Sequence, residues 1–161
     1  MEIVPLEQRP DAIPVCARWA LDTWGSERVR APAAAAALWL RQVKAPGLPL
    51  RWAAVQGREI VGTASLVADD LPARPDLTPW LADVFVPPER RGHGVASALV
   101  HKVEAAAAER GLDTLYLHTE SAQRLYARLG WYEIGCERDA RGAPVTLMAR
   151  DLKESALVTQ R

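Results

Sequence analysis

The sequence is poor in the residues that build disulfide, redox and metal centres. Its 161 residues include only two cysteines, Cys16 and Cys136, and three histidines. The cysteines form no C-x-x-C pair, so buried free thiols are the simpler interpretation than a dithiol centre or a zinc knuckle. The histidines show no H-x-x-x-H spacing and no carboxylates accompany them at ligand intervals, so we expect no metal.

The chain also lacks a net charge and a long apolar run. Its 20 basic residues are balanced by 20 acidic ones, which argues against nucleic acid as the main partner. The alanine run at 33–37 is too short to cross a bilayer, and no signal-like segment opens the sequence. These features predict a soluble, cytoplasmic protein without a membrane partner.

What the chain does have is enough apolar material for a core. It is 49% hydrophobic and 25% charged, a composition typical of folded domains. We find no internal repeat, low-complexity linker or second-domain boundary. The prediction is therefore a single domain over residues 1–152, followed by a flexible tail at 153–161.

The N-terminal half is predicted as an edge strand, two helices and a strand hairpin. Pro5 removes a backbone donor and so restricts the first strand to a sheet edge. Gly25 and Pro46 mark the ends of the two helices, and Gly57 sits in the hairpin turn. The predicted elements are residues 2–6, 11–24, 31–44, 50–55 and 59–67, with a loop at 69–78.

The C-terminal half is predicted to alternate strands and helices before a final hairpin. Gly111 and Gly130 end two amphipathic helices, and the Arg141–Gly142 pair marks the last turn. The predicted elements are strand 81–86, a helix from the following glycine turn to Gly111, strand 114–118, helix 122–129 and strands 131–138 and 144–150.

Residues 81–100, LADVFVPPERRGHGVASALV, carry the strongest chemical signal. The first N–H groups of a helix lack intrahelical partners, and the helix dipole adds positive charge there, so a phosphate is stabilised. Gly92 and Gly94 let a ligand approach the backbone, while Arg90 and Arg91 add full charges. A bare G-x-G is more often an ordinary turn, but this context predicts an anion site.

Two motifs resemble those of one family. Arg91-x-x-Gly94-x-Ala96, preceded by Val86, resembles the acetyl-CoA-binding motif of the GNAT superfamily of N-acetyltransferases. Residues 121–131 resemble its second motif, A-x-x-L-Y-x-x-x-G-F, with Trp131 in place of the usual Phe. The predicted order of strands and helices also matches the GNAT layout over nearly the whole chain. The resemblance implies an α+β fold of three layers, α/β/α, in which helices flank a mixed, mostly antiparallel sheet.

The resemblance further implies acetyl-CoA as the acetyl donor, with no metal. Its diphosphate is expected on the amides of the turn, which comprises Arg91, Gly92, His93, Gly94, Val95, Ala96 and Ser97. Its pantetheine arm and thioester carbonyl are expected along the backbone of Val84, Phe85 and Val86. Thr119 stands where the family often has Asn, seven residues before Tyr126, and is expected to cap the short helix or bond the pantetheine.

Acetyl transfer needs a proton for the departing thiolate and a neutral amine. The resemblance gives the first role to Tyr126, whose alternative is simple packing of the helix face. An alkylamine of pKa about 10.4 is only about one part in a few thousand neutral at pH 7, so either its deprotonation is assisted or the pocket lowers its pKa. Asp83 and Glu120 are the candidates; their alternatives are a salt-bridged strand residue and a helix-start acid. His118 is a further proton relay, or an ordinary core histidine.

The acceptor is left open between a small-molecule amine and a peptide amine. Five acids fall in loops expected near the acceptor: Asp22, Glu27, Asp69, Asp70 and Asp76. They favour a cationic amine, unless they are solvated loop residues. The tryptophans Trp24, Trp39 and Trp80 either wall an aromatic pocket or belong to the core. In the family, the 24–30 connection lines the acceptor pocket, and many members form homodimers.

Two other functions are weighed. Gly92-x-Gly94-x-x-Ser97 imitates a dinucleotide-binding fingerprint, but the Pro87–Pro88 entry, the mid-chain position and the few βα units argue against an oxidoreductase. A non-catalytic CoA-binding module on the same fold is disfavoured by Tyr126. The prediction is transfer of the acetyl group of acetyl-CoA to a primary amine by direct attack in a ternary complex.

Overall fold

The computed structural model describes residues 1–25 and 31–153. The strands are β1 (Glu2–Pro5), β2 (Leu50–Gln56), β3 (Glu59–Val67), β4 (Trp80–Phe85), β5 (Thr114–Thr119), β6 (Tyr132–Arg138) and β7 (Pro144–Asp151). The α-helices are α1 (Ile13–Trp24), α2 (Pro32–Lys44), α3 (Val95–Glu109) and α4 (Gln123–Arg128). Short 3-10 turns cover Leu6–Gln8, Pro10–Ala12 and Pro88–Arg90. Apart from its first residue, Lys153, the predicted tail lies outside the described residues.

The strands are hydrogen-bonded in the order β1-β2-β3-β4-β5-β7-β6. β4 and β5 run parallel, whereas β1–β2, β2–β3, β5–β7 and β6–β7 are antiparallel. The mixed, mostly antiparallel sheet of the α+β prediction is therefore confirmed. The chain forms two compact units, Met1–Leu66 with Asp83–Lys102, and Val67–Ala82 with the residues from Val103 onward. The single-domain expectation stays a prediction.

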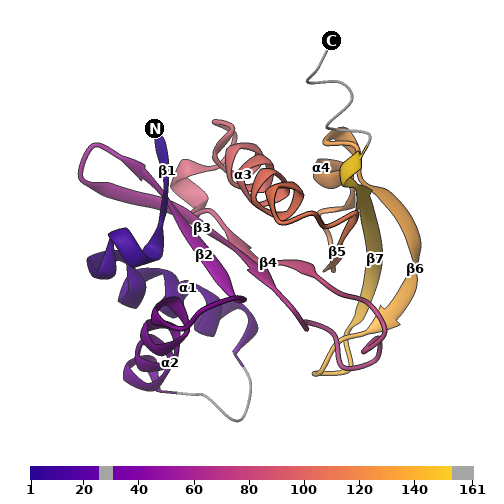
Figure 1. Ribbon diagram of the computed structural model, residues 1–161, viewed down its shortest axis with the longest axis horizontal. Helices are drawn as coiled ribbons and strands as arrows, with labels where there is room; N and C mark the ends of the chain where they lie inside the picture. Colours follow the sequence, from indigo (N-terminus) through magenta and orange to yellow (C-terminus); the bar gives the residue numbers. More distant parts are fainter. Residues whose placement is uncertain (26–30, 154–161) are drawn as a thin grey trace. The chain divides into compact units, whose positions relative to one another are not determined.

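In the first unit, helices cover both faces of the β2–β3 hairpin. One face packs on α1 and α2 through Ile13, Cys16, Trp39, Ala53 and Val55. Gly62 points the other way, since it pairs with Ala54, and a Cβ on it would lie 2.9 Å from Leu99 and 3.0 Å from Val95 of α3. The start of α3 thus packs tightly on β3, which gives the expected helix, sheet and helix layers (Figure 1). β1 is an edge strand, as Pro5 predicted.

In the second unit, the 68–79 loop closes a small core over the sheet. Leu71, Trp80, Val145 and Leu147 form this core, with Tyr116 packed against it. On the opposite face of β5, Leu115 and Leu117 are also buried. Figure 1 shows the long β6–β7 hairpin, whose strands join through Gly142 at φ 84° as the sequence predicted.

The two cysteines differ in their surroundings. Both are free, and burial raises the pKa of the Cys16 thiol to about 12, so it stays protonated at neutral pH. Cys136 is exposed, and the expectation of a buried thiol there is wrong. The reason is that β6 is an edge strand on which most side chains face solvent.

Candidate active site

The turn between β4 and α3 presents a row of backbone N–H groups. Gly92 and Gly94 take φ values of 80° and 81°, and nothing lies within 4 Å of a Cβ built on either. Ala98 is the first residue of the described helix whose N–H bonds back into the turn, to Gly94 O at 3.1 Å. Among the described residues, the N–H groups from Gly92 to Ser97 have no backbone partner. These unpaired donors suit an anion.

The two arginines of the turn play different parts. Arg90 forms an ion pair with Glu59 of β3, so its charge is already compensated. Arg91 donates from Nε to the carbonyl oxygen of Val86 at 2.9 Å, and its guanidinium lies 5.8 Å from the Phe85 ring centroid. This hydrogen bond connects the turn to the residue that follows β4. The charge of Arg91 therefore belongs to the same turn as the unpaired amides.

Asp83 has an unusual backbone within β4. It is the one non-glycine residue with positive φ, 55°, in the described part of the chain. L-residues adopt this region at a cost, and such outliers cluster at functional sites when the surroundings enforce them. The neighbouring positions Val84, Phe85 and Val86 are those expected to meet the donor substrate. Asp83, with its positive φ, thus lies directly before the three residues expected to contact the donor.

Arg51 of β2 supplies the enforcing contact. Its Nη1 donates to Asp83 Oδ2 and to Ser65 Oγ, both at 2.7 Å, and Nη2 donates to Gln42 Oε1 at 2.7 Å. The guanidinium stacks 3.8 Å from the centroid of the Trp39 ring. The Arg51 side chain is only 7% exposed, against 23% for Asp83. Asp83 is therefore the partner of a buried cation that α2 also holds.

In the second unit, β4 runs beside β5 in parallel. Their pairing within the described residues of this unit is confined to Trp80 and Tyr116, with Tyr116 N–H bonded to Pro79 O at 3.1 Å. β5 nevertheless continues to Thr119, whose hydroxyl accepts a hydrogen bond from Ala122 N–H at 3.0 Å. Thr119 thus closes the turn that leads into α4, but the N-cap residue of the helix is Ala122 and the helix has no side-chain cap hydrogen bond.

Tyr126 lies on α4 and is 7% exposed. Its ring meets Trp131 edge-on at 6.0 Å between centroids. Burial raises the pKa of its phenol to about 12, so the hydroxyl keeps its proton at neutral pH. The ring both packs the helix face and carries a permanent donor, so the two expectations for this residue do not exclude one another.

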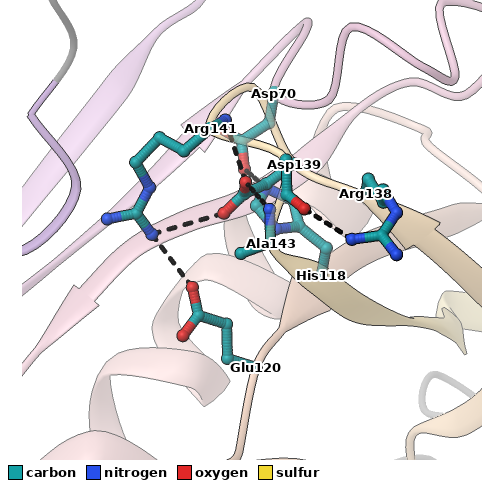
Figure 2. A network of polar contacts seen from close by, with 8 residues as sticks. Asp70, His118, Glu120, Arg138, Asp139, Arg141 and Ala143 are labelled. Carbon is teal, nitrogen blue, oxygen red and sulfur yellow. Dashed lines mark hydrogen bonds and ion pairs between the residues drawn. The ribbon is translucent and has the colours of Figure 1, made fainter.

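A polar network lies around the end of β5 (Figure 2). His118 Nε2 lies 2.9 Å from Asp70 Oδ2. Glu120 Oε1 accepts a hydrogen bond from Arg141 Nη2 at 2.9 Å, and the same nitrogen lies 3.3 Å from Asp139 Oδ2. Glu120 is 52% exposed, so it is an ion-paired acid at the surface.

Two groups of this network have shifted pKa values. Burial opposes a charge on Asp139, but the backbone N–H groups of Ala143 and Arg141 and the Arg141 guanidinium together lower the pKa of its carboxyl. Burial likewise opposes protonation of His118, yet the hydrogen bond and charge of Asp70, with a contribution from Asp139, raise the pKa of its ring above 6.5. The protonated form of His118 is therefore favoured relative to a free imidazole.

The remaining acids and tryptophans that the sequence linked to the acceptor do not form one cluster with the network around β5 in the described residues. Asp22 and Asp76 form exposed ion pairs with Arg18 and Arg74. Trp39 and Trp80 are buried, whereas Trp24 is 40% exposed. Glu27 and most of the 24–30 connection lie outside the described residues.

Sequence reasoning missed the pairing of His118 with Asp70 and all of the Arg51 contacts. A signal for Arg51 exists, since it is a lone charge in the apolar run at 50–55. A charge at such a position is buried only with a partner. No signal in the sequence names that partner.

Within residues 1–25 and 31–153, no group of three His, Cys, Asp or Glu side chains is arranged to hold a metal ion. No helix in these same ranges combines the length and apolar character needed to cross a bilayer.

A mixed α+β sheet with an amide-lined turn between β4 and α3 suits the class of proteins that bind phosphate groups at a helix N-terminus. Within this class, the chain belongs to the acetyltransferase (GNAT) family, whose model matches residues 13–131. Membership identifies an N-acetyltransferase, and the expected family and enzyme class are confirmed. No curated protein matches the sequence.

Solved structures share the fold at low identity. An aminoglycoside 6'-N-acetyltransferase complexed with coenzyme A is 19% identical, with a TM-score of 0.73, covering 94% of this chain and 97% of its own. An aminoglycoside 6'-N-acetyltransferase from Enterococcus faecium is 20% identical, with a TM-score of 0.70 and coverages of 94% and 97%. Mutant forms of a spermidine/spermine N-acetyltransferase from Vibrio cholerae are 16% identical, with a TM-score of 0.72 and 95% of each chain covered.

Proposed function

We propose that the protein transfers the acetyl group of acetyl-CoA to a primary amine by direct attack in a ternary complex. The observation that carries the proposal is the row of N–H groups from Gly92 to Ser97 without backbone partners. A diphosphate supplies acceptor oxygens for several such donors at once, and the helix dipole and Arg91 add positive charge. The open space above Gly92 and Gly94 admits a group as bulky as a diphosphate.

The strand before the turn is suited to the arm of the donor. Acetyl-CoA supplies an activated thioester, and the chain must hold it still and polarise its carbonyl. Backbone groups of Val84, Phe85 and Val86 would bind the pantetheine, and an N–H of Phe85 or Val86 would meet the thioester oxygen. The Arg51–Asp83 contact supports this role because it fixes the backbone directly before these residues.

Tyr126 would donate to the departing sulfur. A phenol of pKa about 12 remains protonated at pH 7 and offers a hydrogen bond throughout the reaction. Complete transfer to a thiolate whose conjugate acid has a pKa of about 8.5 is uphill by roughly 5 kcal/mol. We therefore assign Tyr126 the stabilisation of the sulfur as the C–S bond breaks, with the proton following in concert.

Asp83 and Glu120 remain predictions as general bases. Each carboxylate is bound by an arginine, Arg51 or Arg141, and each pair would have to loosen before the carboxylate could take a proton. The Thr119 hydroxyl accepts a hydrogen bond from Ala122 N–H and would still have its own hydrogen to donate to the pantetheine.

A cationic amine is the acceptor class that we propose to screen first. Acidic side chains are frequent in the loop before β4, including Asp69, Asp70 and Asp76. The solved relatives are named for acetylating aminoglycosides and spermidine or spermine, both polycationic amines. The homodimer expected from the resemblance stays a prediction.

The test combines binding and turnover. Calorimetry with acetyl-CoA measures binding, and thiol release with polyamines, aminoglycosides and amino acids measures transfer. Gly94→Val should abolish acetyl-CoA binding, because a β-branched residue is strained at φ 81° and its side chain would enter the diphosphate site.

Gly57→Val is the matched control. Gly57 also has positive φ, 62°, and open space above it, but it lies in the β2–β3 turn. This variant should bind acetyl-CoA as tightly as the parent protein. Equal loss of binding in both variants would mean that Gly94 acts only through folding. Tight CoA binding without transfer to any amine would instead support a non-catalytic CoA module.

A further inference from the structure

The buried guanidinium of Arg51 is held in place by two neighbouring elements. Its Nη2 donates to Gln42 Oε1 of α2, and the group stacks on the Trp39 ring of the same helix. Its Nη1 donates to Ser65 Oγ of β3 and to Asp83 Oδ2, both at 2.7 Å. The Arg51 side chain is only 7% exposed. The Asp83 carboxylate is therefore bound to a group that α2 and β3 also hold.

Asp83 is the residue at which the backbone of β4 leaves the ordinary strand conformation. Its φ is 55°, whereas a strand residue has a φ of about −120°. In a regular strand, successive residues point in alternate directions, and a local irregularity re-aims the groups that follow it. The directions of the Val84 and Phe85 N–H groups therefore depend on how Asp83 is held.

The other end of this segment is held by separate contacts within the same unit. The Phe85 ring packs on Trp19 of α1 at 5.3 Å between centroids. A Cβ on Gly62 of β3 would lie 3.1 Å from the Phe85 carbonyl oxygen, so the two backbones approach closely there. The carbonyl oxygen of Val86 accepts a hydrogen bond from Arg91. These contacts fix the end of β4 independently of the ion pair.

Stability alone does not explain a buried ion pair at this position. The desolvation of two charges offsets much of their attraction, and apolar residues of similar volume often stabilise a fold as well. A buried pair does favour one conformation, because any other leaves its charges unmatched. At Asp83, that conformation is one that L-residues adopt at a cost. The effect of the pair is therefore expected in the geometry of the residues that follow.

We propose that Arg51 is a positioning residue that acts through Asp83 and holds the backbone of residues 84–86 so that an N–H group points at the thioester oxygen of acetyl-CoA. The inference rests on the proposed acetyl transfer and deepens it. As the amine adds to the carbonyl carbon, negative charge develops on this oxygen, and a donor already in place stabilises it. The role differs from that of the base considered for Asp83, because a tether needs only an acceptor oxygen.

The kinetic test separates a tether from a base at the same position. Asp83→Asn keeps an acceptor oxygen for Arg51 and tolerates positive φ, but it cannot take a proton from an ammonium group. Asp83→Gly also adopts positive φ, but it gives the guanidinium no side chain to bind. A tether predicts that kcat stays within about 5-fold in the first variant and falls about 10²-fold in the second, the effect of a misplacement of roughly 1 Å. A base predicts equal losses in both.

An infrared measurement reports on the thioester carbonyl without an acceptor. Acetyl-CoA labelled with carbon-13 at this carbonyl is bound to the full chain, and its C=O band is compared with that of free acetyl-CoA. A backbone hydrogen bond polarises the carbonyl, so the band of the parent complex should move to lower wavenumber. Asp83→Gly should lose most of this shift, whereas Asp83→Asn should keep it. The affinity for CoA without an acetyl group should not change in either variant.

Thr63→Val is the matched control for loss of a buried hydrogen bond. The buried Thr63 hydroxyl donates to Trp52 O at 2.8 Å within the β2–β3 hairpin, and its removal leaves the ion pair in place. The band and kcat of this variant should match those of the parent protein. Gln42→Leu is a second probe, because it removes the acceptor of Arg51 Nη2 and keeps Asp83. It should lose part of the band shift.

The outcomes distinguish this inference from the proposed function. A parent-like band in Asp83→Gly, or in Gln42→Leu if only that variant folds, would overturn the positioning role. Equal losses of kcat in Asp83→Asn and Asp83→Gly, with the band unchanged in both, would overturn it in favour of a general base. Absence of transfer to every amine, with the band shifted in the parent protein and not in Asp83→Gly, would count against the proposed function and support the positioning role.

Discussion

Replacing Arg51 by methionine should strongly destabilise the protein. Methionine keeps much of the volume that packs on Trp39 but removes the donors to Asp83, Ser65 and Gln42. Asp83 would keep its charge and its positive φ but lose its hydrogen bond from Arg51. The perturbation therefore isolates the polar role of one buried side chain.

The magnitude follows from burial. Removing one partner of a buried ion pair costs about 3–5 kcal/mol, because its hydrogen bonds and charge attraction are lost in a poorly solvated place. The Asp83 side chain is 23% exposed, so water recovers part of its solvation. We expect a loss of about 2–4 kcal/mol in the free energy of unfolding. For a chain of this size, that lowers Tm by roughly 5–15 °C.

The assay is urea and thermal unfolding of four proteins. Arg18→Met is the matched control, because Arg18 pairs with Asp22 at the surface and its loss should cost less than about 1 kcal/mol. The double variant Arg51→Met with Asp83→Gly should be more stable than Arg51→Met alone. Glycine removes the carboxylate that Arg51 had bound and adopts positive φ without strain. A double variant no more stable than the single one, or a single loss as small as that of the control, would refute the reasoning.

Three further outcomes are expected. Tyr126→Phe should lower kcat by about 10²-fold or more while the calorimetric affinity for acetyl-CoA changes little, and equal turnover would remove Tyr126 from the sulfur-donor role. Because Asp70 raises the pKa of His118 in the folded protein, the pair stabilises fully below pH 6.5 and loses this effect as pH rises through the folded pKa. His118→Asn should therefore cost more unfolding free energy at pH 5.5 than at pH 8.5, and the opposite order would contradict the assigned shift. Trp131→Phe removes the bond from Trp131 Nε1 to the buried Glu104 at 3.0 Å and should cost about 1–3 kcal/mol in urea unfolding; a neutral effect would show that Glu104 finds another donor.

The helices and strands could be read from the sequence because their signals are local. Gly25, Gly111 and Gly130 ended helices as predicted, and Gly57 turned the first hairpin. The position of Pro5 placed β1 at the edge of the sheet. These residues act through their own backbone geometry or that of close neighbours, so no tertiary contact was needed to interpret them. Errors arose where neighbours matter, as for Cys136, whose exposure depends on which strand covers β6.

For the candidate site too, the sequence predicted what depends on local residues and missed what depends on tertiary contacts. The anion turn of Gly92 and Gly94 was predicted because helix N-termini expose donors whatever surrounds them. The Tyr126 motif was also visible, but its role depends on a pKa that burial alone sets. The pairing of Arg51 with Asp83 and that of His118 with Asp70 were not predictable, since their partners are 32 and 48 positions apart in the sequence.

By itself, the sequence determined the order of the elements, the glycine turn before α3 and the family, because periodicity, glycine positions and motif spacing are properties of neighbouring residues. Only the tertiary structure decided which charges are compensated. Ion pairing and burial depend on strands and loops that meet after folding, so the sequence could not show that Asp83 pairs with Arg51, Glu120 with Arg141 and His118 with Asp70.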